Sequence, residues 1–114
     1  MLVDAPCSGL GVLRRRADAR WRVSEEEIER LSSLQEKLLL SALNLVASGG
    51  QLIYSVCTVT STETTEVDER FRAKTGIQSC GLLPEPWRVH GQGGILLPQD
   101  LNSEGMAVFR YQVE

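Results

Sequence analysis

The chain has 114 residues, and its 12 Lys and Arg residues against 15 Asp and Glu residues give a formal net charge of −3. Hydrophobic residues make up 42% of the sequence and charged residues 24%, a composition that excludes intrinsic disorder and collagen-like repeats. The length predicts one domain with one core, and no apolar run approaches the roughly 20 residues that a membrane-spanning helix needs.

The predicted structure begins with a short buried strand over residues 2–4. Two apolar residues lead to Asp4, and Pro6 then breaks the strand. Cys7 follows in a glycine-containing loop. The strand is therefore expected to deliver both Asp4 and Cys7 at its carboxyl end.

An arginine-rich segment follows this loop. Residues 1–22 contain five arginines against two aspartates, whereas the remainder of the chain is acidic. A basic patch in an acidic chain is typical of a surface that binds phosphate groups, and a solvated arginine run beside a loop is the alternative. The arginines are Arg14, Arg15, Arg16, Arg20 and Arg22.

A long amphipathic helix is predicted over residues 24–48. Ser24 followed by Glu27 forms a capping box at its start, and Gly49-Gly50 is expected to end it. Apolar residues recur between them at spacings of three and four, which indicates one buried face. This stripe consists of Ile28, Leu31, Leu34, Leu38, Ala42 and Leu45.

The second half of the chain alternates between strands and a helix. Residues 51–56 form a nearly continuous apolar strand that ends in Cys57 and a Thr/Ser cluster, and a weaker helix is predicted over 63–74. A short strand over 77–80, a long loop rich in Gly and Pro, and a strand of alternating pattern over 106–113 complete the chain.

This order predicts an α/β fold with parallel strands joined by crossover helices. In such sheets ligands bind beyond the carboxyl ends of the strands. Asp4 and Cys7 follow one strand and Cys57 follows the next, so these side chains are expected to face one cleft.

Several functions remain open for the cysteines. Three are too few for a disulfide framework, which favours a reducing cytoplasm, although a bridge between Cys7 and Cys57 is geometrically conceivable. A metal site is not expected, because the three cysteines and His90 lie singly and Asp4 with Cys7 is the only closely spaced pair that involves any of them. Cys80, inside a short apolar segment, is interpreted as a structural thiol.

A cysteine nucleophile is the sharper hypothesis. Thiolates are favoured at helix N-termini and near cations, and Cys57 precedes a helix while Cys7 precedes the arginines. His90 stands in a Gly/Pro loop and is expected to be exposed, so a Cys-His hydrolase is a weak alternative.

Two motifs resemble a known family. Asp4-Ala5-Pro6-Cys7-Ser8-Gly9, continued by Leu10–Arg15, is similar to one signature of the RNA cytosine-5 methyltransferases, and Tyr54-Ser55-Val56-Cys57-Thr58 with Glu63 is similar to the second. The branch resembled is the bacterial Sun or Fmu type, which methylates small-subunit ribosomal RNA. Two motifs in the right order make this a specific signal.

The resemblance implies S-adenosylmethionine as cofactor and RNA as partner. It implies that Cys57 is the catalytic nucleophile and that Cys7 assists breakdown of the covalent intermediate. It also implies that Asp4 is catalytic, since it lies between cofactor and cytosine and helps to keep the ring nitrogen protonated, and that Asp4 and Pro6 bind the cofactor. Phosphate contacts of the RNA are then expected at Arg14, Arg15, Arg16 and Arg22.

The resemblance also implies that residues 1–114 are the C-terminal part of one Rossmann-like catalytic domain, with a mostly parallel sheet and an antiparallel last strand. The glycine-rich cofactor loop of the family is not found in this sequence, so the 114 residues alone are expected to be inactive. The open edge of the first strand is expected to favour self-association. A non-catalytic RNA-binding module that uses the arginine patch is the alternative, and a cysteine enzyme of unrelated chemistry is another.

Overall fold

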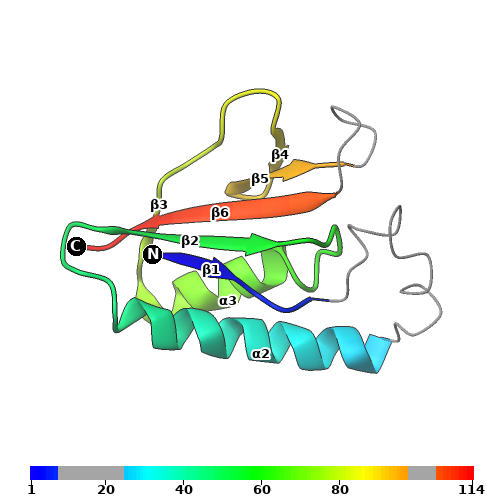
Figure 1. Cartoon of the computed structure of the whole chain (residues 1–114), viewed down its shortest axis with the longest axis horizontal. Helices are drawn as coiled ribbons and strands as arrows, with labels where there is room; N and C mark the ends of the chain where they lie inside the picture. Colours follow the sequence, from blue (N-terminus) through cyan, green and yellow to red (C-terminus); the bar gives the residue numbers. More distant parts are fainter. Residues whose placement is uncertain (8–24, 98–104) are drawn as a thin grey trace.

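The computed structural model describes residues 1–7, 25–97 and 105–114, and these residues form one six-stranded sheet with two helices on one of its faces (Figure 1). The strands lie in the order β1-β2-β6-β5-β4, and β3 pairs with β6 beside this path. The arginine patch lies outside the described residues.

Strands β1 (Leu2–Asp4) and β2 (Gln51–Val56) are parallel neighbours, as the sequence predicts. Leu2 pairs with Ile53 and Asp4 pairs with Ser55, so the two strands end at the same edge of the sheet. Among the described strands, β1 pairs only with β2. Self-association through its other edge stays a prediction.

Helix α2 (Glu25–Leu43) connects these two strands. It ends five residues earlier than the sequence predicts, because the chain turns after Leu43: the Leu45 amide donates to the Ala42 carbonyl at 2.9 Å. Leu45, expected on the buried stripe, is therefore 73% exposed.

Helix α3 (Thr65–Thr75) follows β2 and ends at Gly76, which takes a left-handed conformation with φ 71°. Its amide donates to the Arg72 carbonyl at 2.8 Å, so the predicted glycine stop is confirmed. The helix begins two residues later than expected, after a turn that occupies residues 61–64.

The region expected to be a long loop contains a hairpin. Strands β4 (Arg88–His90) and β5 (Gly93–Leu96) pair with each other, and β5 also pairs with β6 (Met106–Gln112). The Gly and Pro residues, which indicate turns, conceal these short strands in the sequence.

The sheet is mixed, and its parallel part is confined to β1 and β2. The last strand β6 is antiparallel to β2, as expected, but the hairpin and the short β3 (Gln78–Ser79) add further antiparallel pairs. The expected α/β fold with an antiparallel last strand is therefore confirmed, whereas most of the strand pairs among the described residues are antiparallel.

The core lies between the sheet and the two helices. Alternating residues of β2 and β6 face the helices, and Tyr54 and Phe109 pack with ring centroids 6.1 Å apart. Phe71 of α3 meets Tyr111 of β6 edge-on at 5.0 Å. The fully or almost fully buried apolar side chains are those of Leu39, Leu52, Tyr54, Val56, Val67, Phe71, Ala107, Phe109 and Tyr111.

None of the helices in the described ranges is long and apolar enough to cross a membrane. The same residues contain no group of three or more His, Cys, Asp or Glu side chains that could hold a metal ion.

Candidate active site

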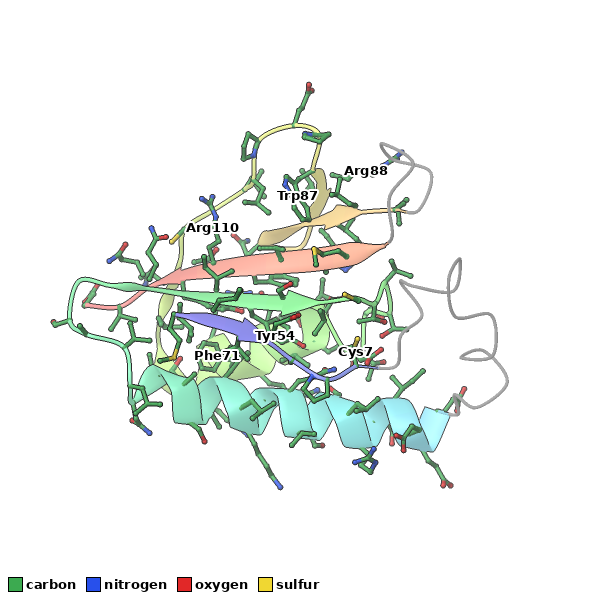
Figure 2. The ribbon with its side chains drawn as sticks, viewed as in Figure 1. Cys7, Tyr54, Phe71, Trp87, Arg88 and Arg110 are labelled. Atoms are coloured by element: carbon green, nitrogen blue, oxygen red, sulfur yellow. The ribbon has the colours of Figure 1, made fainter. Side chains whose placement is uncertain are left out.

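The carboxyl ends of β1 and β2 bring the two motif cysteines to one edge of the sheet. The Ala5 amide donates to the Ser55 carbonyl at 3.0 Å, which extends the pairing one residue beyond β1. Cys7 and Cys57 each follow within two residues of this hydrogen bond. Figure 2 shows Cys7 beyond the end of β1, above helix α2.

The four described site residues differ in exposure. Asp4 and Pro6 are exposed, whereas Cys7 and Cys57 are half-buried and no cysteine forms a disulfide. Asp4 lies on the sheet face opposite the helices, because it shares a face with Ser55 and not with the core residue Tyr54. This edge of the sheet therefore carries one exposed carboxyl group and two half-buried thiols.

Cys7 packs against the core cluster that includes Tyr54. Burial raises the pKa of Tyr54 far above its ordinary value, and the nearby Glu63 and Cys7 raise it further. The Tyr54 hydroxyl is thus a hydrogen-bond donor here, and it donates to the Glu63 backbone carbonyl at 2.7 Å.

The loop after Cys57 is organised by the buried carboxyl group of Glu63. Its Oε2 accepts hydrogen bonds from the hydroxyl groups of Thr58 at 2.8 Å and Thr60 at 2.7 Å. The Glu63 side chain is inaccessible to solvent. These bonds fold the segment 58–63 back on itself immediately after the cysteine.

Gln35 of α2 joins this loop to the one that carries Cys7. Its Nε2 donates to Glu63 Oε1 at 3.2 Å and to the Pro6 carbonyl at 2.9 Å. The sequence alone assigns no role to Gln35 or Thr60, and it singles out Thr58 only as part of the second motif. The polar residue within the apolar stripe of the helix was the available signal for Gln35.

A second polar contact ties both helices to the same loop. Ser32 Oγ donates to the Thr62 carbonyl at 2.7 Å and accepts from Arg70 at 2.6 Å. Arg70 and Lys74 of α3 both pair with Glu36 of α2, Arg70 Nε at 2.6 Å. Although burial opposes the effect, these two cations lower the pKa of Glu36 below its ordinary value.

The sequence predicts that His90 is exposed, but in the structure it is half-buried. It lies in β4, and its Nε2 is 2.8 Å from Thr64 Oγ1 at the start of α3. Its ring packs 6.4 Å from that of Phe109, centroid to centroid. Burial lowers the pKa of His90.

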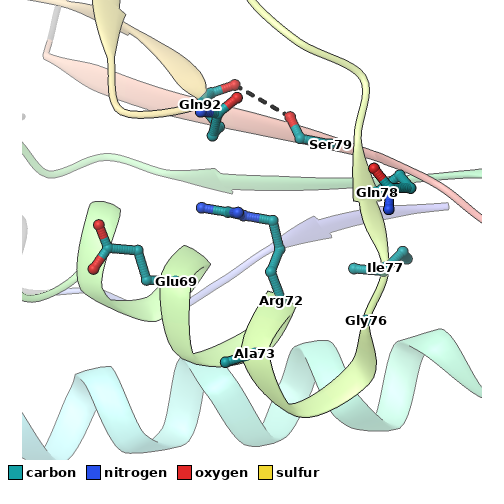
Figure 3. Close-up of a pocket in the computed structure, with 8 residues that line it drawn as sticks. All are labelled: Glu69, Arg72, Ala73, Gly76, Ile77, Gln78, Ser79 and Gln92. Carbon is teal, nitrogen blue, oxygen red and sulfur yellow. Dashed lines mark hydrogen bonds between the residues drawn. The ribbon is translucent and has the colours of Figure 1, made fainter.

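Cavities lie beside the loop that follows Cys57 and at the C-terminal end of α3. A cavity of about 350 Å³ lies between the first turns of α2 and the loop 58–63, and it is lined by Glu25, Ile28, Glu29 and residues 60–62. Another, of about 550 Å³, lies at the end of α3 and β3 (Figure 3). Its lining contains none of the predicted site residues, and Arg72 within it pairs with Asp68 at 2.9 Å.

Known proteins are similar to this chain in sequence and in fold. "Ribosomal RNA small subunit methyltransferase B" of Pseudomonas putida is 36% identical over 106 residues, which are 92% of this chain and 24% of that protein. The crystal structure of PH0851 matches with a TM-score of 0.90 and 27% identity, over 96% of this chain and 25% of the other.

The structure of NSun6 from Pyrococcus horikoshii with SFG matches with a TM-score of 0.77 and 24% identity, over 97% of this chain and 29% of the other, which shows a common fold. The chain spans about a quarter or less of the length of the curated relatives it matches. The family model described as 16S rRNA methyltransferase RsmB/F matches residues 1–111. By this match and by its relatives, the chain belongs to the RsmB/F family of ribosomal RNA methyltransferases.

Proposed function

We propose that this chain supplies the two-cysteine part of an S-adenosylmethionine-dependent methyltransferase that modifies carbon 5 of cytosine in small-subunit ribosomal RNA. The observation that carries the proposal is the edge where Cys7 and Cys57 follow paired parallel strands, beside the exposed Asp4. The family and the relatives named above support ribosomal RNA as the substrate class.

The chemistry explains why two thiols are needed. Carbon 5 of cytosine is a weak nucleophile, so the Cys57 thiolate first forms a bond to carbon 6, and the displaced electron pair increases the density at carbon 5. S-adenosylmethionine, when bound, supplies the electrophilic methyl group that carbon 5 takes up. A base then removes the proton of carbon 5, and the bond to Cys57 breaks with its electron pair returning to sulfur.

Cys7 is proposed to assist this last step. Its half-buried thiol lies at the same edge of the sheet as Cys57, in a loop that packs against the core, and these two features support the assignment. Asp4 is proposed to hydrogen-bond the ring of the cytosine and to keep the ring nitrogen protonated, which makes carbon 6 more electrophilic.

Asp4 and Pro6 are also the residues proposed to lie at the cofactor. Both are exposed at the carboxyl end of β1, where α/β sheets bind their ligands, and a carboxyl group there fits the amino and hydroxyl groups of S-adenosylmethionine. The NSun6 structure with SFG, an analogue of that cofactor, supports cofactor use in this fold.

Arg14, Arg15, Arg16 and Arg22 are proposed as phosphate contacts of the RNA, from their charge alone. We propose the cytoplasm as the compartment, since ribosomal RNA and thiols that remain reduced are both found there.

We further propose that the 114 residues transfer no methyl group on their own, because the glycine-rich cofactor loop of the family is not in this sequence. The test uses a chimera in which residues 1–111 replace the matched segment of the Pseudomonas putida relative. The chimera and the 114-residue chain are each incubated with cofactor and with ribosomal RNA that contains 5-fluorocytosine, which blocks the loss of the carbon 5 substituent.

The chimera is expected to form a covalent RNA adduct that peptide mapping places on Cys57. The 114-residue chain alone is expected to form no such adduct. Cys57→Ala should abolish the adduct. With ordinary RNA, Cys7→Ala should accumulate an adduct that Cys80→Ala, the matched control, does not. An adduct on Cys7, or methylation that survives Cys57→Ala, would contradict the proposal.

A further inference from the structure

Gln35 is an amide side chain in the middle of an apolar helix face. It is inaccessible to solvent and lies one turn from the buried Leu31 and Leu39. Burying an amide costs free energy unless its hydrogen bonds are replaced. Within the described part of the chain, Gln35 Oε1 is buried with no hydrogen-bond partner, so the replacement is incomplete.

Both hydrogens of the amide nitrogen, by contrast, have acceptors. One bond of 2.9 Å goes to the Pro6 carbonyl, next to Cys7, and the other of 3.2 Å goes to Glu63 Oε1. An apolar residue of the same size would remove the orphaned oxygen, but it would also take this donor away from the Pro6 carbonyl and from the buried Glu63 Oε1. What distinguishes Gln35 from an apolar residue at this position is that its two donors join two separate acceptors.

Each donor reaches a different cysteine loop. Pro6 immediately precedes Cys7, and Glu63 holds the hydroxyl groups of Thr58 and Thr60 after Cys57 through its second oxygen. The two loops are 50 residues apart in sequence but share this one amide nitrogen.

We propose that Gln35 is a positioning residue that fixes the Cys7 loop relative to the Cys57 loop. The inference rests on the proposed function, in which both thiols act on one cytosine. Small displacements of reacting groups are costly, since a misplacement of about 1 Å can lower a rate about a hundredfold. A single donor pair on a rigid helix keeps the two thiols in register.

The test measures how fast each cysteine of the 114-residue chain is alkylated by iodoacetamide, as a function of pH, with peptide mass spectrometry to separate the three sites. Gln35→Met removes both donors at nearly constant volume. Gln78→Met, at an exposed position of β3, is the matched control. Cys80 lies outside both loops and serves as the internal reference.

Gln35→Met is expected to raise the alkylation rates of Cys7 and Cys57 relative to Cys80 by about fivefold, the factor that corresponds to about 1 kcal/mol. The pH profiles of these two thiols should shift while that of Cys80 does not. Gln78→Met should leave all three unchanged. If Gln35→Met does not fold, Gln35→Asn, which keeps the donors but shortens their reach, is measured in the same way.

A merely structural role would accelerate all three cysteines together, and that result would overturn the proposal. A change at only one of Cys7 and Cys57 would also overturn it, because the two loops would then not be coupled. Alkylation needs neither RNA nor cofactor. A chimera that forms no RNA adduct therefore refutes the proposed function, while the alkylation ratios still decide whether Gln35 couples the loops.

Discussion

The Tyr54 hydroxyl donates a 2.7 Å hydrogen bond to the backbone carbonyl of Glu63, nine residues further along the chain. Tyr54 is part of β2, and Glu63 is the residue whose carboxyl group organises the loop after Cys57. The bond therefore closes the segment that carries the proposed nucleophile onto the strand from which it departs.

Tyr54→Phe is expected to lower the free energy of unfolding by about 1–2 kcal/mol, because the Glu63 carbonyl loses its buried donor. Urea denaturation measures the change. Tyr111→Phe is the matched comparison and should cost more, about 1.5–3 kcal/mol, because the Tyr111 hydroxyl donates to the carboxyl group of Asp68 at 2.7 Å. A Tyr54→Phe variant as stable as the parent would show that the bond is not formed.

Gly93 lies where β5 passes β6 at close range. A Cβ atom at this position would stand 2.4 Å from the Val108 carbonyl oxygen and 2.6 Å from the Phe109 ring, so Gly93→Ala must push the strands apart. We expect a loss of about 3 kcal/mol. Gly49→Ala is the control, because Gly49 has open space around it and loses only about 1 kcal/mol from its positive φ. Equal losses in thermal or urea unfolding would contradict the steric argument.

The sequence predicted the elements that carry the strongest periodic signals. The long helix, the apolar strand 51–56 and the alternating strand near the C-terminus all recur in the structure, and the parallel pairing of β1 with β2 follows from their order. These signals are local, because side-chain period and glycine stops are properties of neighbouring residues.

What the sequence did not predict depends on tertiary contacts. The hairpin of β4 and β5 is short and rich in glycine, and it exists as a strand pair because β6 offers an edge to it. Gln35 and His90 are typical of exposed positions until their partners are known. Their hydrogen-bond partners lie 26 to 29 positions away, Pro6 and Glu63 for Gln35 and Thr64 for His90, and a local pattern cannot identify such partners even where, as for Gln35, it marks the residue as unusual.

The ion pairs of Glu36 join α2 to α3, and the stability that they add to the folded chain depends on pH. Its pKa is lowered in the folded chain, because the hydrogen bonds from Lys74 and Arg70 outweigh its burial. A carboxyl group of this kind adds stability above its unfolded pKa of about 4.3, and this stability is lost as the pH falls through the lower folded value. Glu36→Gln should therefore destabilise at neutral pH, by about 1–2 kcal/mol, and much less in strong acid.

Urea denaturation of both proteins at a series of pH values measures this difference. Glu29→Gln, on the exposed face of the same helix, is the control and should have little effect at any pH. A loss in Glu36→Gln that persists unchanged well below pH ~4 would contradict the ion-pair explanation.

His90 gives the stability of the chain a second pH dependence, in addition to that of Glu36. Thr64 Oγ1 donates its one proton to the Thr60 carbonyl at 2.6 Å, so His90 Nε2 must be the donor in the 2.8 Å contact between His90 and Thr64. Protonation of Nδ1 then places a charge in a partly buried site, and burial lowers the pKa of His90 for this reason. A lowered pKa of this kind means that the folded chain loses stability as the pH falls from about 6.5 toward the folded value.

His90→Phe keeps a ring against Phe109 but neither titrates nor donates. The parent should be more stable than His90→Phe at pH ~7.5 by about 1 kcal/mol, the net value of one hydrogen bond, and this advantage should shrink as the pH is lowered toward 5. Because the chain has one histidine, the difference between the two urea-denaturation series isolates this imidazole. An advantage that stays constant or grows in acid would mean that His90 gains a proton as easily in the folded chain as in the unfolded one.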